Sequence, residues 1–282
     1  MLVVAAGRLP WEYSSMEKAS TGALLAAAAC SISMFAAPVA ASCVKQSPPH
    51  TVALIELYTS EGCSSCPPAD RWVSALDRKT FDNDRLIPLA LHVDYWDRLG
   101  WKDRFASARY TERQQALSAL AKSRVVYTTE VFLNLREFRD WRSAARFQDA
   151  VRKINAKPAG ADIRLELDSA SPARLPVKAN FTVKPGTPAG QARAFIAVYE
   201  NKLVTEVKAG ENRGESLRHD YVVREWIGPL ELNGGKAEFA RTLTLDRGWI
   251  AQNLGVAAFV QDLASGEVLQ ATALPLCLPG SS

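Results

Sequence analysis

Residues 52–68 read Val-Ala-Leu-Ile-Glu-Leu-Tyr-Thr-Ser-Glu-Gly-Cys-Ser-Ser-Cys-Pro-Pro, and this stretch decides the fold prediction. It begins with a nearly continuous apolar run, which is typical of a strand buried on both faces. A Ser-Glu-Gly turn ends the run, and Cys63 and Cys66 follow with two residues between them. The two prolines suit the first turn of a helix, because the backbone N–H groups there lack intrahelical partners in any case. The stretch therefore predicts a strand, a Cys-x-x-Cys pair and a helix in direct succession.

Outward from this stretch, strand and helix patterns alternate through the first half of the chain. Apolar runs predict strands at 86–93 and 125–135, and apolar residues at helical spacing predict helices at 69–76, 107–122 and 138–154. Alternation of this kind is typical of a sheet layered with helices. We therefore predict an α/β domain over residues 50–157.

The composition changes after residues 157–160 (Lys-Pro-Ala-Gly), which we interpret as a linker. Short β-rich runs then alternate with turns of Pro, Gly and Asn, and no long helical pattern occurs. This pattern is typical of antiparallel sandwiches. We therefore predict a second, mostly antiparallel β-sandwich-like domain over 161–277.

The first 42 residues have the layout of a secretory signal peptide. A short charged segment precedes an apolar core at 21–35, and small residues follow the core. This core is shorter than the ~20 residues that span a bilayer, so we expect cleavage after Ala41 or Ser42 rather than a membrane anchor. We therefore predict a periplasmic or secreted protein that is not an integral membrane protein after cleavage. The alternative is lipid attachment at Cys43, because the Ala-Ala-Ser-Cys sequence ending there resembles a lipid-attachment box.

Removal of the signal peptide would leave four of the five cysteines, Cys43, Cys63, Cys66 and Cys277. An even number of cysteines in an oxidising compartment favours disulfides. We predict that Cys63 pairs with Cys66 and that Cys43 pairs with Cys277. The alternative leaves the two terminal cysteines free or lipidated.

The pair of Cys63 and Cys66 is the predicted site of chemistry. A cysteine at a helix N-terminus ionises easily, because partial positive charge and free N–H groups stabilise its thiolate. We therefore predict a thiol–disulfide oxidoreductase in which an exposed Cys63 attacks and Cys66 resolves the mixed disulfide. Its partners would be protein or small-molecule thiols and a redox partner that recycles the pair. This reaction needs no cofactor and no resident metal.

Two other interpretations of the pair stay open. In the first, the chain is a periplasmic metal- or ligand-binding protein without enzymatic turnover, holding copper through Cys63, Cys66 and His92. A zinc ribbon would need a second Cys-x-x-Cys or paired histidines, whereas the three histidines are scattered. In the second, the pair is a structural staple in an exported interaction module. The net charge of +4 and the absence of a basic block give nucleic-acid binding no support.

A polar and aromatic segment follows the strand predicted at 86–93. The carboxyl end of that strand lies at the same sheet edge as the cysteine pair, where ligands gather in open α/β sheets. Asp94 is therefore a candidate catalytic residue, and Tyr95 and Trp96 are candidates for substrate binding. The alternative is that Asp94 caps a turn while both aromatic rings cover the core. For His92, packing in the core is the favoured interpretation.

Several motifs carry a family resemblance. They read Ile-Glu-Leu-Tyr-Thr-Ser-Glu-Gly-Cys-Ser-Ser-Cys-Pro-Pro-Ala-Asp at 55–70, His-Val-Asp-Tyr-Trp-Asp at 92–97, Ala-Gly-Glu-Asn-Arg-Gly at 209–214 and Leu-Arg-His-Asp-Tyr-Val-Val-Arg at 217–224. Together they resemble the exported, thioredoxin-like family called domain of unknown function 1223, over nearly all of the mature chain. The resemblance implies an α/β thioredoxin-like domain followed by a β domain, in a secreted or periplasmic protein. It supplies no known reaction.

The resemblance also implies a cis-proline opposite the dithiol, within residues 126–130, where substrate backbone would meet the sulfurs. Thr129 stands where that proline is expected. A cis bond before a residue other than proline costs about 2.5–4 kcal/mol, so we expect a trans bond and a reshaped loop. Thr128 and Thr129 are the candidate substrate-binding residues of this loop. The absence of this proline weakens the redox interpretation and favours the metal-binding one.

The later motifs are dense in charged residues. We expect their side chains either to line a pocket for an acidic ligand or to form a charged network against the first domain. These residues are Glu211, Arg213, Arg218, His219, Asp220 and Arg224.

Overall fold

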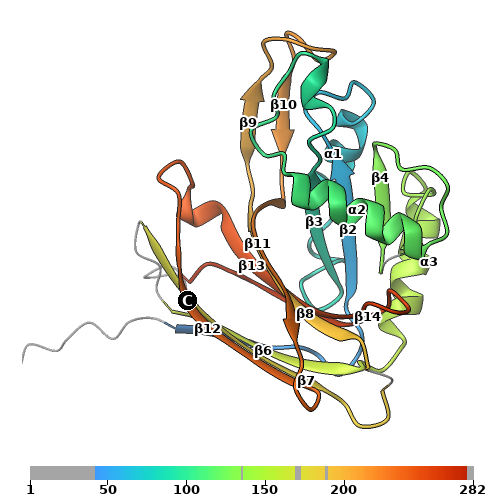
Figure 1. Cartoon of the computed structure of the whole chain (residues 1–282), viewed down its shortest axis with the longest axis vertical. Helices are drawn as coiled ribbons and strands as arrows, with labels where there is room; N and C mark the ends of the chain where they lie inside the picture. The colour runs from blue at the N-terminus through green and yellow to red at the C-terminus, as the bar shows by residue number, and fades with distance from the viewer. Residues whose placement is uncertain (1–41, 135, 169–172, 188–189, 278–282) are drawn as a thin grey trace, which may run out of the picture. The chain divides into compact units, whose positions relative to one another are not determined.

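The computed structural model describes residues 42–134, 136–168, 173–187 and 190–277, so the predicted signal peptide lies outside the described residues. The described strands form three sheets, which Figure 1 shows together with the helices that cover them. In chain order the elements are β1 (Ser42–Gln46), β2 (Ala53–Thr59), α1 (Pro67–Ser74), β3 (Leu86–His92), η1 (Asp97–Leu99), α2 (Ala108–Leu120), β4 (Glu130–Leu133), β5 (Arg136–Glu137), α3 (Ala144–Asn155), β6 (Ala161–Asp168), β7 (Arg174–Val183), β8 (Ala192–Glu200), β9 (Leu203–Glu206), β10 (Ser216–His219), β11 (Val222–Glu231), β12 (Lys236–Thr244), η2 (Ala251–Asn253), β13 (Leu254–Asp262) and β14 (Val268–Pro275).

The largest sheet has eight strands in the order β14-β13-β8-β11-β3-β2-β4-β5. β2 and β3 are parallel, in a register that pairs Thr59 with His92 at their carboxyl ends. β3 is also parallel to β11, whereas the other neighbours are antiparallel. Every residue of β2 and β3 is buried, because helices α1 and α3 pack on one face of this part of the sheet and α2 on the other. The apolar run that predicts a strand buried on both faces is therefore explained by helices on both sides.

The second sheet has four strands in the order β1-β6-β7-β12. Its apolar face packs against β8, β13 and β14 to form a core of their buried side chains. β6 alternates buried and more exposed residues, as a strand with one covered face should. A disulfide between Cys43 and Cys277 joins β1 to the segment after β14, so this predicted pairing is confirmed.

The predicted fold class, an α/β thioredoxin-like domain followed by a β-sandwich-like domain, is wrong. The described chain is mostly β, and its largest sheet combines β2–β5 with β8, β11, β13 and β14 from the segment predicted to form a separate sandwich. β8 and β13 are buried along nearly their whole length, because they are central strands covered on both faces. An apolar run in the sequence does not say which strand it pairs with, so the pattern alone favours two smaller sheets.

The segment interpreted as a linker is bonded to both halves of the chain. The Ala159 amide donates to the Pro49 carbonyl at 2.9 Å, and the Gly160 amide donates to the Leu269 carbonyl at 2.9 Å. Backbone hydrogen bonds of this kind connect the segment to chain on both sides of it in the sequence.

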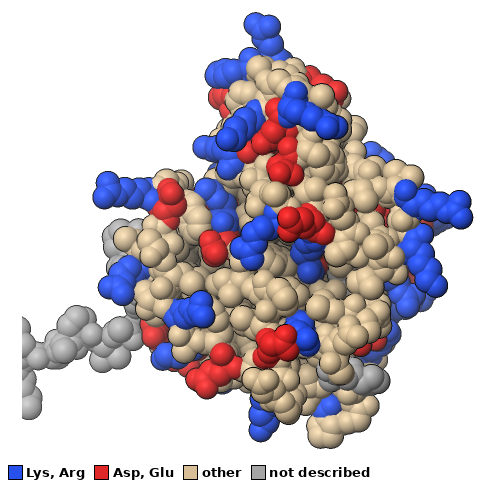
Figure 2. All heavy atoms as spheres, in the orientation of Figure 1, with Lys and Arg blue, Asp and Glu red and all other residues tan. Residues whose placement is uncertain are grey.

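Charged side chains of both signs are interspersed over the face drawn in Figure 2. Within the described ranges, no helix has both the length and the apolar character needed to cross a membrane.

Candidate functional site

The cysteine pair lies in the short loop between the end of β2 and the start of α1. The Cys63 amide donates to the Ser60 carbonyl, and the Cys66 amide donates to the Cys63 carbonyl, both at 3.2 Å. Cys66 is the N-cap residue of α1, and its carbonyl accepts from the Ala69 amide at 2.9 Å. A disulfide joins Cys63 to Cys66, so the predicted pairing is confirmed.

Both cysteines are buried, with an exposed fraction of 0% for each. The prediction of an exposed Cys63 is therefore wrong. The segment between β9 and β10, residues 207–215, which we call the covering loop, lies against the backbone of the cysteine loop. Its Asn212 side-chain amide donates to the carbonyl of Cys63 at 3.0 Å, across 149 positions of sequence. The local motif does not reveal this contact, because the contacting residues are so far apart along the chain.

Further contacts hold the covering loop against the cysteine loop. The Glu211 carboxylate accepts from the amide of Ser64 at 3.0 Å and from its hydroxyl at 2.7 Å. These hydrogen bonds lower the pKa of Glu211. Gly210 has a φ of 74°, and a Cβ there would lie 3.0 Å from the Cβ of Trp101. The glycine therefore permits both the left-handed backbone and the close approach of the covering loop to Trp101.

The side chain of Ser65 lies beside the Cys63 sulfur. This side chain is exposed, and its hydroxyl oxygen lies 3.3 Å from the Cys63 sulfur. A cavity of about 290 Å³ opens beside Ser65, and its other walls include Thr128, Arg139 and Arg142. Movement of the Ser65 side chain would therefore connect the sulfur with this cavity.

Two of the predicted substrate-binding residues, Thr128 and Thr129, line this cavity, and the other two, Tyr95 and Trp96, hydrogen-bond to Thr128. The Tyr95 hydroxyl hydrogen-bonds to the Thr128 hydroxyl, and the Trp96 indole N–H donates to the same oxygen at 3.1 Å. The peptide bond between Thr128 and Thr129 is cis, so the expectation of a trans bond is wrong. The Thr129 hydroxyl is buried and has no hydrogen-bond partner among the described residues.

Asp94 binds to helix α2. Its carboxylate accepts from the Thr111 hydroxyl at 2.6 Å, and its backbone amide donates to the same hydroxyl at 3.2 Å. Both contacts are with a side chain of α2 and not with a turn. Among the described residues, no hydrogen bond joins Asp94 to the cysteine loop.

A pair of buried charged groups lies behind the cysteine loop. Nδ1 of His92 lies 2.6 Å from Oδ2 of Asp103, and both side chains are 0% exposed. Burial alone would lower the pKa of His92, but the neighbouring Asp103 carboxylate raises it above its usual value. Burial alone would raise the pKa of Asp103, and the attraction of His92 lowers it instead. Asp103 also accepts from the Glu61 amide at 2.9 Å, which fixes the backbone two residues before Cys63.

A second buried pair continues this cluster. Nε2 of His219 lies 3.4 Å from Oε1 of Glu61, and the ring centroids of His219 and His92 are 5.0 Å apart. Burial opposes ionisation of Glu61, but the nearby His219 and the Trp101 indole N–H, which donates to Oε2 of Glu61 at 2.9 Å, lower its pKa overall. Glu61 and Asp103 are not among the residues predicted for the site, because only the fold brings His219 of β10 beside them.

Asp70 is a third buried acid, one helical turn beyond Cys66. Its carboxylate accepts from the Thr59 hydroxyl at 3.1 Å, and burial raises its pKa. On a helix, residues four positions apart share one face. Asp70 is therefore a carboxyl group that stays protonated more easily than usual and lies on the same side of α1 as Cys66.

The described residues contain no group of three or more His, Cys, Asp or Glu side chains arranged to hold a metal ion. Cys63, Cys66 and His92 do not form such a group, and Nδ1 of His92 is engaged by Asp103. The copper alternative gains no support from this geometry.

Comparison with known proteins gives a family and a fold. A family model described as "Protein of unknown function (DUF1223)" matches residues 54–261. The chain is similar to the crystal structure of protein AGR_C_4864 from Agrobacterium tumefaciens, at 25% identity over 84% of this chain and 98% of that one, with a TM-score of 0.56. It is also similar to HBP35 of Porphyromonas gingivalis, at 14% identity over 84% of this chain and 79% of that one, with a TM-score of 0.61, which shows a likeness of fold alone. No curated protein matches the chain.

Proposed function

We propose that this chain, which belongs to the family described as protein of unknown function DUF1223, is an exported protein that exchanges disulfides with thiols through Cys63 and Cys66. The family description assigns no reaction, so the proposal is argued from the site. The observation that carries the proposal is the placement of the disulfide. It lies at the start of α1, with a protonatable buried acid one turn beyond it and a cavity beside Ser65, whose exposed side chain contacts the Cys63 sulfur.

In the first step, a substrate thiolate attacks the Cys63 sulfur. A new disulfide forms between the substrate and Cys63, and the bond to Cys66 breaks with its electron pair remaining on the Cys66 sulfur. The N-terminus of α1 stabilises this thiolate.

In the second step, another substrate thiolate attacks the substrate sulfur of the mixed disulfide. Cys63 leaves as a thiolate, and two substrate thiols have become one disulfide while the protein has gained two electrons. A second disulfide-bearing partner must then oxidise the pair for the protein to turn over. Protein or small-molecule thiols are the proposed substrates.

Export is the part of the proposal that the cysteines support. Two disulfides account for all four cysteines of the described chain, and such bonds persist in oxidising compartments. The layout of the first 42 residues favours a periplasmic or secreted location in the same way.

Burial of both cysteines favours a second candidate, in which the bond is a structural staple of an exported binding protein. The reduction potential separates the two functions. We would equilibrate the purified protein in glutathione buffers and quantify the free thiols of Cys63 and Cys66 by mass spectrometry. A potential above about −300 mV supports exchange, whereas a lower value is typical of structural bonds and would reject it.

Trapping tests the order of attack. A Cys66→Ser variant should form a stable mixed disulfide between Cys63 and glutathione when it is treated with glutathione disulfide. The matched Cys63→Ser variant should react more slowly at Cys66, because Ser65 and the cavity lie beside Cys63. Equal rates in the two variants would contradict the assignment of Cys63 as the attacked sulfur.

A further inference from the structure

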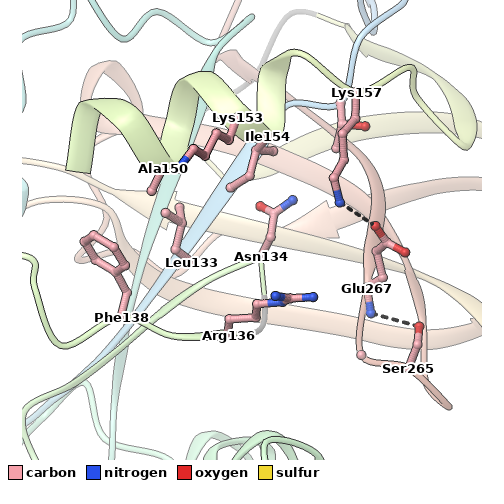
Figure 3. Close-up of a pocket in the computed structure, with 12 residues that line it drawn as sticks. Leu133, Asn134, Arg136, Phe138, Ala150, Lys153, Ile154, Lys157, Ser265 and Glu267 are labelled. Carbon is pink, nitrogen blue, oxygen red and sulfur yellow. Dashed lines mark hydrogen bonds and ion pairs between the residues drawn. The ribbon is translucent and has the colours of Figure 1, made fainter. Parts of the chain in front are cut away.

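A larger cavity of the described chain lies away from the cysteines. Its volume is about 490 Å³, and its walls come from the end of β4, from β5, from α3 and from the turn between β13 and β14 (Figure 3). Thr51 reaches it just before β2, whereas Cys63 follows β2, so the seven residues of that strand, at about 3.3 Å each, separate the two places. The size falls within the range of small-molecule sites.

One side of the cavity is apolar. Leu133, Phe138, Ala150 and Ile154 line it, and all four belong to or pack against the core around α3. Phe147 and Val151 of the same helix are buried in that core, so Ala150 and Ile154 lie at its edge and border the cavity. An apolar group of a ligand would leave water by entering here, which favours binding.

The rim of the cavity is positively charged. Arg136, Lys153 and Lys157 line it together with a single acid, Glu267. Lys157 lies 3.2 Å from Glu267, and both side chains are more than half exposed. No carboxylate of the described residues pairs with Arg136, which extends from β5 towards the β13–β14 turn in Figure 3. Lys153 lies 2.7 Å from Asp149 of the same helix, so Arg136 is the cation of the rim that has no partner in the part of the chain that the structure describes.

Asn134 adds a fixed polar group between the apolar side and the rim. Its carboxamide oxygen accepts from the Leu54 amide at 2.7 Å, which orients the side chain and leaves its NH₂ group available. Figure 3 shows this side chain within the cavity, between α3 and Arg136. An anionic or carbonyl oxygen in the cavity would therefore meet donors from both Asn134 and Arg136.

We propose that this cavity binds an amphipathic organic anion, with an acyl chain or aromatic ring against Leu133, Phe138 and Ile154 and a carboxylate against Arg136. The apolar wall disfavours a bare inorganic anion, and the charge of the rim disfavours a cationic amphiphile. The site is independent of the cysteine pair, so it stands whether or not that pair exchanges disulfides.

Isothermal titration with decanoate tests the proposal on the intact oxidised protein. We expect decanoate to bind with a stoichiometry of one, and acetate and decyltrimethylammonium to bind at least about tenfold more weakly, because each lacks one half of the recognised chemistry. Arg136→Ala should weaken decanoate binding about fivefold, as loss of a partly exposed ionic contact does. Arg146→Ala is the matched control, because Arg146 is an exposed cation of α3 that pairs with Asp140 outside the cavity.

Ala150→Phe tests the apolar half by filling the cavity, and it should abolish binding while circular dichroism confirms that the variant is folded. The proposal is overturned if decanoate fails to bind, if decyltrimethylammonium binds as tightly, or if Arg136→Ala binds decanoate as the unaltered protein does. The comparison of Arg136→Ala with Arg146→Ala remains decisive even if Ala150→Phe does not fold, because Arg136 is exposed and its replacement leaves the core intact.

Discussion

Replacement of Asp103 should destabilise the protein more than any replacement of an exposed acid. Its carboxylate accepts from Nδ1 of His92 at 2.6 Å and from the amides of Glu61 and Phe105, both at 2.9 Å. Asp103→Ala leaves three buried donors without an acceptor, one of them the imidazole N–H of His92. Removal of one partner from a buried ion pair costs about 3–5 kcal/mol, and we expect a loss in that range. Asp103→Asn keeps the shape and one acceptor, so it should cost less, about 1–3 kcal/mol.

The pH dependence supplies a second readout. Because folding raises the pKa of His92, protonation of His92 stabilises the fold, and this stabilisation is fully present below about pH 6.5. It is lost as pH rises through the pKa of His92 in the folded state. The lowered pKa of Asp103 stabilises the fold above about pH 4, and this contribution is lost as pH falls through its folded-state pKa. The difference between Asp103→Ala and the unaltered protein should therefore be largest near pH 5–6 and smaller at pH 9.

Urea unfolding, followed by circular dichroism at both pH values, measures this difference. Asp140→Ala is the control, because Asp140 forms an exposed pair with Arg146 and should change stability by under about 0.5 kcal/mol. A loss below about 1 kcal/mol for Asp103→Ala, or a loss that is the same at both pH values, would refute the role assigned to the buried pair.

Three further predictions concern Ser65, the bond between Cys43 and Cys277, and Glu130. Ser65→Ala should speed reduction of the Cys63 disulfide by dithiothreitol roughly threefold, because it removes the hydroxyl 3.3 Å from the sulfur. The control is Ser123→Ala, at a half-buried serine outside the cysteine loop, and a rate of reduction that Ser65→Ala leaves unchanged would contradict the prediction. Replacement of Cys43 and Cys277 by serine should lower the free energy of unfolding by about 5 kcal/mol in the chain-entropy model, because the bond closes a loop across 234 positions; a urea midpoint equal to that of the unaltered protein would contradict it. Burial raises the pKa of Glu130 to about 7, so the stability of the protein should fall as pH rises from about 4.5 to 7. The Glu130→Gln variant should therefore be more stable than the unaltered protein by about 1–2 kcal/mol at pH 8, and this gain should shrink by pH 5. A gain in urea titrations that does not depend on pH would contradict the titration of Glu130.

The local part of the site could be predicted from the sequence because its causes are local. An apolar run, two cysteines with two residues between them and two prolines together predict β2, the disulfide loop and α1, and the structure has all three. The pairing of Cys43 with Cys277 follows from elimination once Cys63 and Cys66 are joined.

The rest depends on contacts between distant segments, which a single sequence does not reveal. The covering loop reaches Cys63 across 149 positions, so burial of the sulfurs is invisible in the motif itself. β8 and β13 have the composition of buried strands, but only the three-dimensional pairing shows that they extend the sheet of β2 and β3. The predicted fold class was wrong for this reason.

The bond between Cys43 and Cys277 also decides how the molecule responds to force. The two Cα atoms are 5.6 Å apart, so a pull applied outside these residues travels through sulfur and bypasses every sheet between them. An oxidised molecule stretched from its two ends would keep its strands paired under loads that separate the same strands once the bond is reduced. A protein attached to a surface at one end and to a moving partner at the other would thus resist mechanical unfolding for as long as its surroundings stay oxidising.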